Sequence, residues 1–207
     1  MPYFPFFMNI EGESCLVVGG GNTALRKIEK LLPFKPEIHV VAKNICEEIR
    51  NMDSVEISEQ EFRDDDISDA RFVIAATNNR DLNARIAMLC KNAKIPCNSV
   101  DDPENIPKNW GFFFPALVHY GDVVVGISTG GKSPVLAAKL RGEIENFIDP
   151  KIAEICERMG ELRSYVKENF PNEAARKKAF KSALECCFEN DTVPGLEELI
   201  DYLKEQI

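Results

Sequence analysis

A glycine-rich turn between a strand-like run and a helix-like run constrains the fold of this chain most. Residues 14–25 read SCLVVGGGNTAL, in which Gly19, Gly21 and Ala24 form the pattern Gly-x-Gly-x-x-Ala. A buried-type strand over 15–18 leads into the glycines, and an amphipathic run follows them. Gly19 permits a tight turn, Gly21 lets a pyrophosphate approach the backbone, and Ala24 allows a helix to pack closely on a strand. Because the helix start also offers free N–H groups, the pattern predicts dinucleotide binding; the alternative is an ordinary glycine turn.

Strand-like and helix-like segments alternate along the chain up to residue 100. Further strands are expected over 37–42, 54–58, 71–76 and 95–100, and helices over 44–51 and 81–93. Strands that alternate with helices in this way predict βαβ units, a parallel sheet and right-handed crossover connections. The acidic residues 64–66 are interpreted as a solvated loop within this series.

The pattern changes after Asp101, where the stretch DDPENIPKNWG is rich in turn residues. FFFPALVHY and DVVVGIS, which meet at residues 120–121, predict a pair of strands. They are too apolar for an exposed pair, so we expect them to form a two-fold interface between identical chains. A second glycine loop then leads into a helix that has Ser133 as its N-cap and Pro134 in its first turn. From residue 151 onward the pattern is helical, with breaks at prolines.

Composition limits the classes of partner. The 207 residues include 25 basic and 34 acidic ones, a net charge of −9, and no basic stripe that could neutralise nucleic-acid phosphates. No apolar run approaches the ~20 residues of a membrane span. The apolar segment 1–10 lacks the basic residues of a signal peptide. We therefore expect a cytoplasmic protein that binds neither nucleic acid nor membrane, with segment 1–10 packed on the core.

The seven cysteines are interpreted as reduced structural thiols. Their number is odd and their spacing matches no metal-binding pattern, so no metal site is predicted. Reduced thiols are typical of a reducing compartment. The adjacent pair Cys186 and Cys187 is interpreted as helix packing.

The ends of the second and fourth expected strands offer candidates for contact with a dinucleotide. An Asp or Glu usually bonds the adenine ribose after the second strand, but here the chain has Lys43 and Asn44. Lys43 could meet the 2′-phosphate of NADP or be a surface lysine, and Asn44 could be a helix cap. Thr77 and Asn78 follow the fourth strand. They either touch the cofactor or form a turn that Asn78 or Asn79 caps.

Charged residues indicate two further sites. Asp101 ends the fifth expected strand at the same edge of the sheet, where it would accept a proton or bind a cationic intermediate. The alternative is a simple turn aspartate. The second glycine loop, 128–134, offers N–H groups and Lys132 to carboxylates or phosphates. Lys139 and Arg141 follow on the helix after this loop.

Four blocks of the sequence, taken together, carry a family resemblance. They read MPYFPFFMNIEGESCLVVGGGNTALRKIEKLL, FVIAATNNRDLN, IPCNSVDDP and FFFPALVHYGDVVVGISTGGKSPVLAAKLRGEIE. With the helical tail, they resemble precorrin-2 dehydrogenase, the amino-terminal module of siroheme synthases, over nearly the whole chain. No methyltransferase extension follows, so the chain is similar to the stand-alone form. One departure is the stretch NIPKNWG beside the expected active site, where Trp110 either stacks on the substrate or packs in a solvent loop.

The resemblance implies an α/β fold in three parts. A Rossmann-type parallel sheet forms an NAD-binding domain over 1–111, a small α+β dimerisation segment with the second glycine loop spans 112–149, and an all-helical C-terminal domain spans 150–207. The implied protein is a homodimer in siroheme biosynthesis. It uses NAD to oxidise its tetrapyrrole substrate, precorrin-2, to sirohydrochlorin.

The resemblance and the patterns above together give a set of site residues. The cofactor site comprises Gly19, Gly21, Asn22, Thr23, Lys43, Asn44, Thr77 and Asn78. The resemblance favours NAD over NADP despite the lysine, and it makes Asp101 the catalytic residue. The groups expected to hold the carboxylate-rich substrate are Thr129, Gly130, Lys132, Lys139 and Arg141. Two alternatives stay open: a bifunctional enzyme that also inserts ferrous iron, and a non-catalytic NAD-sensing module.

Overall fold

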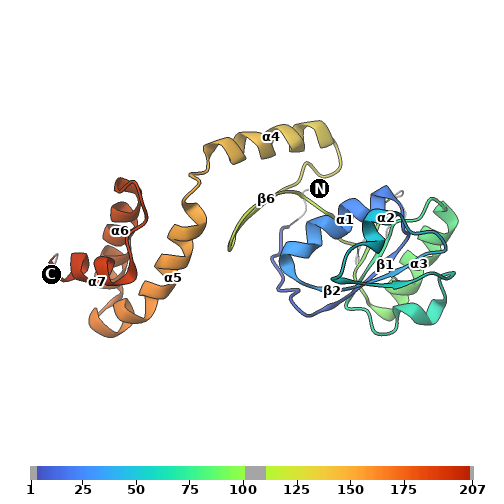
Figure 1. Ribbon diagram of the computed structural model, residues 1–207, viewed down its shortest axis with the longest axis horizontal. Coiled ribbons are helices and arrows are strands. Elements are labelled where there is room, and N and C mark those ends of the chain that lie inside the picture. Colours follow the sequence, from blue (N-terminus) through green and yellow to red (C-terminus); the bar gives the residue numbers. More distant parts are fainter. Residues whose placement is uncertain (1–3, 101–110, 206–207) are drawn as a thin grey trace. The chain divides into compact units, whose positions relative to one another are not determined.

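The computed structural model describes residues 4–100 and 111–205, and the chain divides into two compact units (Figure 1). One unit is residues 4–114, and the other begins at Pro115. None of the helices in the described ranges combines the length and the apolar character that crossing a membrane requires. The three-part division with boundaries at 111 and 149 stays a prediction.

The first unit is built on a five-stranded parallel sheet. Its strands are β1 (Ser14–Val18), β2 (Glu37–Val41), β3 (Val55–Ser58), β4 (Phe72–Ala75) and β5 (Cys97–Ser99). Their spatial order is β3-β2-β1-β4-β5. The chain adds β2 and β3 on one side of β1 and then β4 and β5 on the other, so the strand order reverses between β1 and β4. In open sheets of this kind, ligands bind outside the carboxyl ends of the strands at that reversal point. The predicted parallel sheet is confirmed.

Helices cover both faces of this sheet. One face carries α1 (Asn22–Leu31), the short 3-10 turn η1 (Leu32–Phe34) and α2 (Glu47–Arg50), and the other carries α3 (Arg80–Ala93). Alternate residues of β1 belong to the hydrophobic cores on the two faces of the sheet. Cys15 and Val17 pack with α1, and Leu16 and Val18 pack with α3. Burial on both faces explains why this strand is a continuous apolar run.

Two short segments differ from their predictions. The acidic residues 64–66, interpreted as a solvated loop, belong to a 3-10 helix, η2 (Asp64–Ile67), although Asp64 and Asp65 are exposed as expected. The Asp66 carboxylate accepts the Arg63 N–H at the start of this helix at 2.8 Å. The helix expected over 44–51 is the single turn α2. Its N-cap residue is Cys46, so Asn44 is not a helix cap.

The N-terminal segment also differs from its prediction. Phe4, Phe6 and Phe7 are 78%, 81% and 73% exposed, although we expected this segment to pack on the core. Over residues 4–10, the described part of the segment, the chain forms neither helix nor strand, and Ile10 packs against the sheet core.

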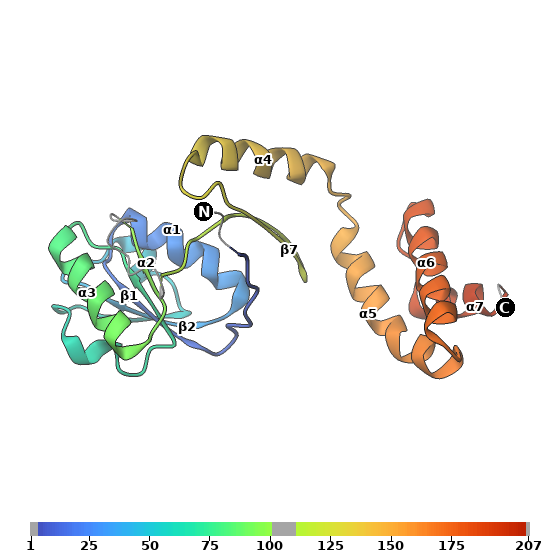
Figure 2. The same ribbon diagram turned by 180° about the vertical axis from the view of Figure 1, so that it is seen from behind.

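The second unit contains a hairpin followed by four helices within residues 115–205 (Figure 2). The elements are β6 (Ala116–Tyr120), β7 (Val123–Ile127), α4 (Pro134–Phe147), α5 (Ile152–Asn169), α6 (Glu173–Glu189) and α7 (Leu196–Glu205). β6 and β7 pair antiparallel as an isolated two-stranded sheet. Ser133 caps α4 as predicted, since its Oγ accepts the Leu136 N–H at 3.2 Å. The helices α5, α6 and α7 share one core, so the predicted fold class is confirmed.

Candidate dinucleotide-binding site

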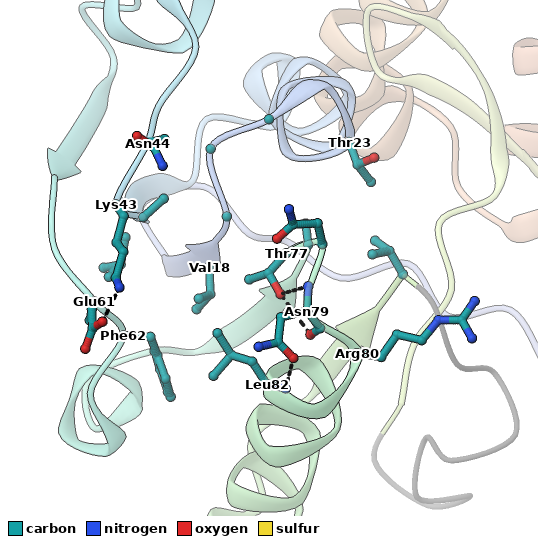
Figure 3. A pocket seen from close by; sticks show the side chains of 18 of the residues that line it. Val18, Thr23, Lys43, Asn44, Glu61, Phe62, Thr77, Asn79, Arg80 and Leu82 are labelled. Atoms are coloured by element: carbon teal, nitrogen blue, oxygen red, sulfur yellow. Dashed lines mark hydrogen bonds and ion pairs between the residues drawn. The ribbon is translucent and has the colours of Figure 1, made fainter.

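A pocket of about 1170 Å³ lies at the carboxyl edge of the parallel sheet (Figure 3). Its walls come from the segments that follow β1, β2, β3 and β4, and from Val100 after β5. The structure brings all eight predicted cofactor residues to this pocket: Gly19, Gly21, Asn22, Thr23, Lys43, Asn44, Thr77 and Asn78. Residues from distant parts of the chain thus meet at the edge where ligands of such sheets bind.

Three consecutive glycines turn the chain from β1 into α1. Gly19 has a φ of +125°, and a Cβ added there would lie 2.4 Å from the Ala76 carbonyl oxygen. A Cβ on Gly20 would lie 2.4 Å from the Asn44 carbonyl oxygen, whereas one on Gly21 would meet no heavy atom within 4 Å. The first two glycines therefore let the turn pack against the loops after β4 and β2. The third leaves space on the pocket side. The sequence pattern did not single out Gly20.

The start of α1 is open to a ligand. Gly21 is the N-cap residue, and in the described part of the chain no side chain caps the first turn, which also contains no acidic residue. The first N–H groups of the helix therefore remain available, and the helix dipole adds partial positive charge. Ala24 is fully buried and lets α1 pack closely on the sheet. These features fit the pyrophosphate of a dinucleotide.

Thr77 holds the turn between β4 and α3. Its hydroxyl lies 2.7 Å from Oδ1 of Asn83 and 3.0 Å from the carbonyl oxygen of Asn79, and either can accept its proton. The Thr77 N–H donates to Asn83 Oδ1 at 3.1 Å, and Asn83 Nδ2 donates to the Thr77 carbonyl at 2.9 Å. Asn79 Oδ1 accepts the Leu82 N–H at 3.1 Å, so Asn79 is the cap. Thr77 thus lines the pocket while its hydroxyl bonds to the protein.

Asn83 anchors that turn, and the sequence analysis missed it. Its side chain is only 1% exposed, and it lies on α3 close to the buried Ile86 and Ala87. A polar residue on the apolar stripe of an amphipathic helix is the signal that would have revealed it.

We expect Asn83→Ala to lower the free energy of unfolding by about 1–3 kcal/mol, because the N–H and carbonyl of Thr77 lose buried partners. Urea denaturation measures the change. Asn92→Ala is the matched control, since Asn92 is exposed near the end of the same helix. A loss in Asn83→Ala no greater than in the control would contradict the anchoring role.

An ion pair lies at the wall of the pocket that the segment after β2 helps to form. Lys43 Nζ pairs with the carboxylate of Glu61, and both residues line the pocket (Figure 3). The hydrogen bond and charge of Lys43 lower the pKa of Glu61 below its ordinary value, so Glu61 is ionised at neutral pH. Phe62 and Leu82, both half-buried, add an apolar wall. The sequence did not reveal Glu61 or Phe62, because no motif marks the loop after β3.

The predicted catalytic residue, Asp101, lies outside the described residues, as does Trp110. Val100, which precedes Asp101 in the chain, lines the pocket. The catalytic role of Asp101 and the alternative of a turn aspartate both stay predictions.

The second glycine loop belongs to the second unit and is held by its own hydrogen bonds. Thr129 Oγ1 accepts the Ser133 N–H at 3.3 Å, and the Lys132 N–H donates to the Thr129 carbonyl at 3.2 Å. Gly130 and Gly131 have φ values of +63° and +77°, which favour glycine. The hydroxyl of Thr129 therefore has a structural part in the loop.

Lys139 and Arg141 are exposed cations on α4. Each pairs with a glutamate one turn later, Lys139 with Glu143 at 3.6 Å and Arg141 with Glu145 at 3.8 Å. Exposed pairs of this kind contribute little to stability. Their contact with a substrate stays a prediction.

The cysteines show no ligand cluster. Among the described residues, no group of three or more His, Cys, Asp and Glu side chains is placed to hold a metal ion. All seven cysteines are free. Burial raises the pKa of the Cys15 thiol far above its ordinary value, so this thiol stays protonated and unreactive.

The fold and the pocket define a class of protein. A parallel sheet with a reversal between β1 and β4, a glycine turn after β1 and an uncapped helix start beside a pocket are the features of Rossmann-type dinucleotide-binding proteins.

Comparison with known proteins gives the family. Residues 6–116 match the family model described as "Putative NAD(P)-binding", and residues 122–146 match the model described as "Sirohaem biosynthesis protein central". The first match spans more than half of the chain, so the chain belongs to this NAD(P)-binding family. The resemblance found in the sequence is confirmed, and the match to the NAD(P)-binding model supports a nicotinamide cofactor.

Curated relatives support the same grouping, and one solved structure shares the fold. The chain is 37% identical to the siroheme synthase of Thioalkalivibrio sulfidiphilus over 89% of its own length and 38% of the relative. It is 33% identical to that of Nitrosomonas europaea over 100% of its length and 44% of the relative. The chain thus spans about two fifths of the length of these curated relatives. A structure titled "SirC, precorrin-2 dehydrogenase" shares the fold, with a TM-score of 0.80 and 20% identity over 98% of this chain and 100% of that one.

Proposed function

We propose that this chain is an NAD-dependent dehydrogenase that oxidises precorrin-2 to sirohydrochlorin in siroheme biosynthesis. The observation that carries the proposal is the uncapped start of α1 beside the pocket at the carboxyl edge of the sheet. The match of residues 122–146 to a sirohaem biosynthesis model supports the pathway. Relatives named siroheme synthase and a neighbour titled precorrin-2 dehydrogenase support the reaction.

The part of this chain in the reaction is binding, orientation and proton handling. The N–H groups at the start of α1 bind the pyrophosphate, and Phe62 and Leu82 offer the adenine ring an apolar wall. When bound, NAD accepts a hydride from the substrate. Asp101, which follows Val100 in the chain, accepts the proton that precorrin-2 loses as it gains conjugation, or orients the substrate for that step.

Basic groups of the second unit hold the substrate in this proposal. Precorrin-2 carries several carboxylates, and a protein with a net charge of −9 needs a local cluster of cations to attract them. The candidates are Thr129 and Gly130 in the loop, with the cations Lys132, Lys139 and Arg141.

Anaerobic incubation with precorrin-2 and NAD tests the proposal. The absorbance spectrum of sirohydrochlorin should appear when NAD is present and not without it. A chain that binds NAD but leaves precorrin-2 unchanged would instead be an NAD-sensing module. Ferrous iron added after the oxidation tests the second alternative, because a metallated product would show that the chain also inserts iron.

We also infer a homodimer. Val135 and Phe147 at the two ends of α4 are 80% and 90% exposed in the single chain. The hairpin of β6 and β7 forms a two-stranded sheet, a structure that is marginal without further packing. A second copy that covers these apolar surfaces explains both observations.

Light scattering at micromolar concentration should therefore give twice the chain mass of 23.3 kDa. We expect the double variant Val135→Asp and Phe147→Asp to be monomeric, because two charges would be buried at the interface. Met88→Asp is the control, since Met88 is an exposed apolar residue on α3 of the first unit. A monomeric wild-type chain would contradict the inference.

A cytoplasmic location is part of the proposal. All seven thiols are free, and free thiols persist in reducing compartments. Labelling of intact cells with a thiol reagent that cannot cross membranes tests it, because the cysteines of a cytoplasmic chain should remain unlabelled until the cells are opened.

A further inference from the structure

We propose that Glu61 makes the pocket select NAD over NADP, by neutralising Lys43 and by adding a carboxylate on the side of the pocket that reads the adenine ribose. The inference rests on the proposed function, because it concerns the nicotinamide cofactor of the same pocket. It assigns cofactor choice to a residue outside the glycine turn and outside the segment that follows β2.

Glu61 reaches the ribose side from the neighbouring strand. β2 and β3 pair in parallel with their last residues opposite each other, so both strands end at the same level. The Ser58 carbonyl oxygen accepts the Ala42 N–H at 3.2 Å and the Gln60 N–H at 3.0 Å, and the second bond turns the chain after β3. After this turn the Glu61 carboxylate pairs with Lys43 Nζ at the pocket, as the dashed line in Figure 3 shows.

This arrangement supplies the group that the end of β2 lacks. In Rossmann folds a carboxylate after the second strand bonds the ribose 2′-hydroxyl of NAD, whereas a nearby cation accommodates the 2′-phosphate of NADP. Lys43 alone would be the kind of cation that accommodates the 2′-phosphate of NADP. With Glu61 paired to it, the charge of Lys43 is already compensated, and the carboxylate retains oxygen lone pairs that can accept a hydroxyl proton. A 2′-phosphate placed there would instead meet a like charge.

The other cations of the pocket do not restore a phosphate site on this side. Among the described residues that line the pocket, the cations besides Lys43 are Arg80 and Arg85. Arg85 pairs with Asp64 at 2.7 Å. Arg80 lies on the opposite side of the pocket from Lys43 and Glu61 in Figure 3. The side facing the ribose therefore has no unpaired cation among these residues.

The pair can be altered without loss of the fold. The side chains of Lys43 and Glu61 are 65% and 73% exposed, and ion pairs so exposed contribute little to stability. The location of the pair at the pocket is consistent with a role in ligand selection rather than in holding the fold.

Calorimetric titration of NAD and of NADP into the whole chain tests the inference without any turnover. We expect the wild-type chain to bind NAD at least about tenfold more tightly than NADP. Glu61→Gln removes the carboxylate charge and releases Lys43, so NADP affinity should rise roughly tenfold while NAD affinity changes by no more than a few-fold. High salt should weaken the discrimination of the wild-type chain, because the effect is electrostatic.

Glu59→Gln is the matched control. Glu59 lies two residues away and pairs with Arg50, but neither residue lines the pocket. The control should keep the wild-type ratio of the two affinities. Equal binding of NAD and NADP by the wild-type chain, or an unchanged ratio in Glu61→Gln, would overturn the inference while leaving the proposed dehydrogenase standing. Binding of neither nucleotide would overturn both.

Discussion

The variant Gly21→Asp is expected to lose NAD affinity by roughly 100-fold or more while it keeps its fold. Gly21 is the N-cap of α1 with φ −98° and ψ −174°, an extended conformation that any residue adopts, and an added Cβ meets no heavy atom within 4 Å. Aspartate is a favoured N-cap residue, so its carboxylate would accept the free N–H groups of α1. Those are the groups that the pyrophosphate needs, and the added negative charge also repels it.

Calorimetry with NAD and thermal unfolding measure the two parts of this prediction. Gly20→Ala is a control in which the fold itself should be destabilised. Its Cβ would lie 2.4 Å from the Asn44 carbonyl oxygen and 2.8 Å from the Ile45 Cα. That clash with backbone should lower the free energy of unfolding by about 1–3 kcal/mol. Unchanged NAD affinity in Gly21→Asp would show that the start of α1 is not the cofactor site.

Asp101→Ala is expected to reduce turnover by roughly 10²–10⁴, the range for loss of a general acid–base group. NAD affinity and dimer mass should not change, because neither the proposed nucleotide contacts nor the proposed interface includes this side chain. If Asp101 only orients the substrate, the loss should be smaller and shared between kcat and KM. Steady-state kinetics under anaerobic conditions separates these cases.

Asp102→Ala is the control for the identity of the catalytic residue. Asp102 is the next residue along the chain and has the same side chain. We expect its replacement to leave most of the activity. If Asp102→Ala abolishes turnover and Asp101→Ala retains it, the catalytic carboxylate belongs to Asp102.

Features encoded in short stretches of sequence could be predicted. The glycine turn, the buried strand before it and the small Ala24 all lie within 14–25, so a local pattern was enough. The cap at Ser133 followed from the same local chemistry, because an N-cap bonds a backbone N–H three residues ahead. The parallel sheet followed from strands that alternate with helices.

Features that depend on contacts between distant segments could not be predicted. Glu61 gains its role only because β3 ends beside β2 and the chain then turns toward Lys43. Gly20 is constrained by the loop after β2, which lies far along the chain from it. In each case the partner is fixed by tertiary structure rather than by spacing in the sequence.

The prediction that the apolar N-terminal segment packs on the core was wrong for its phenylalanines. Phe4, Phe6 and Phe7 have the composition of a buried segment, yet they are exposed in the single chain. Pro5, which lies between them, lacks the backbone N–H that a strand or helix interior needs. Apolar composition alone therefore does not decide whether a segment packs within its own chain.

The most direct test of the proposed dehydrogenase is an anaerobic single-turnover experiment that measures NADH and sirohydrochlorin together. Loss of one hydride and one proton from precorrin-2 requires one NADH for each sirohydrochlorin formed. We predict that both products rise at the same rate and in equal amounts with the wild-type chain, and that neither forms with Gly21→Asp. Sirohydrochlorin formed without NADH, or no product from a wild-type chain that binds NAD, would contradict the assignment.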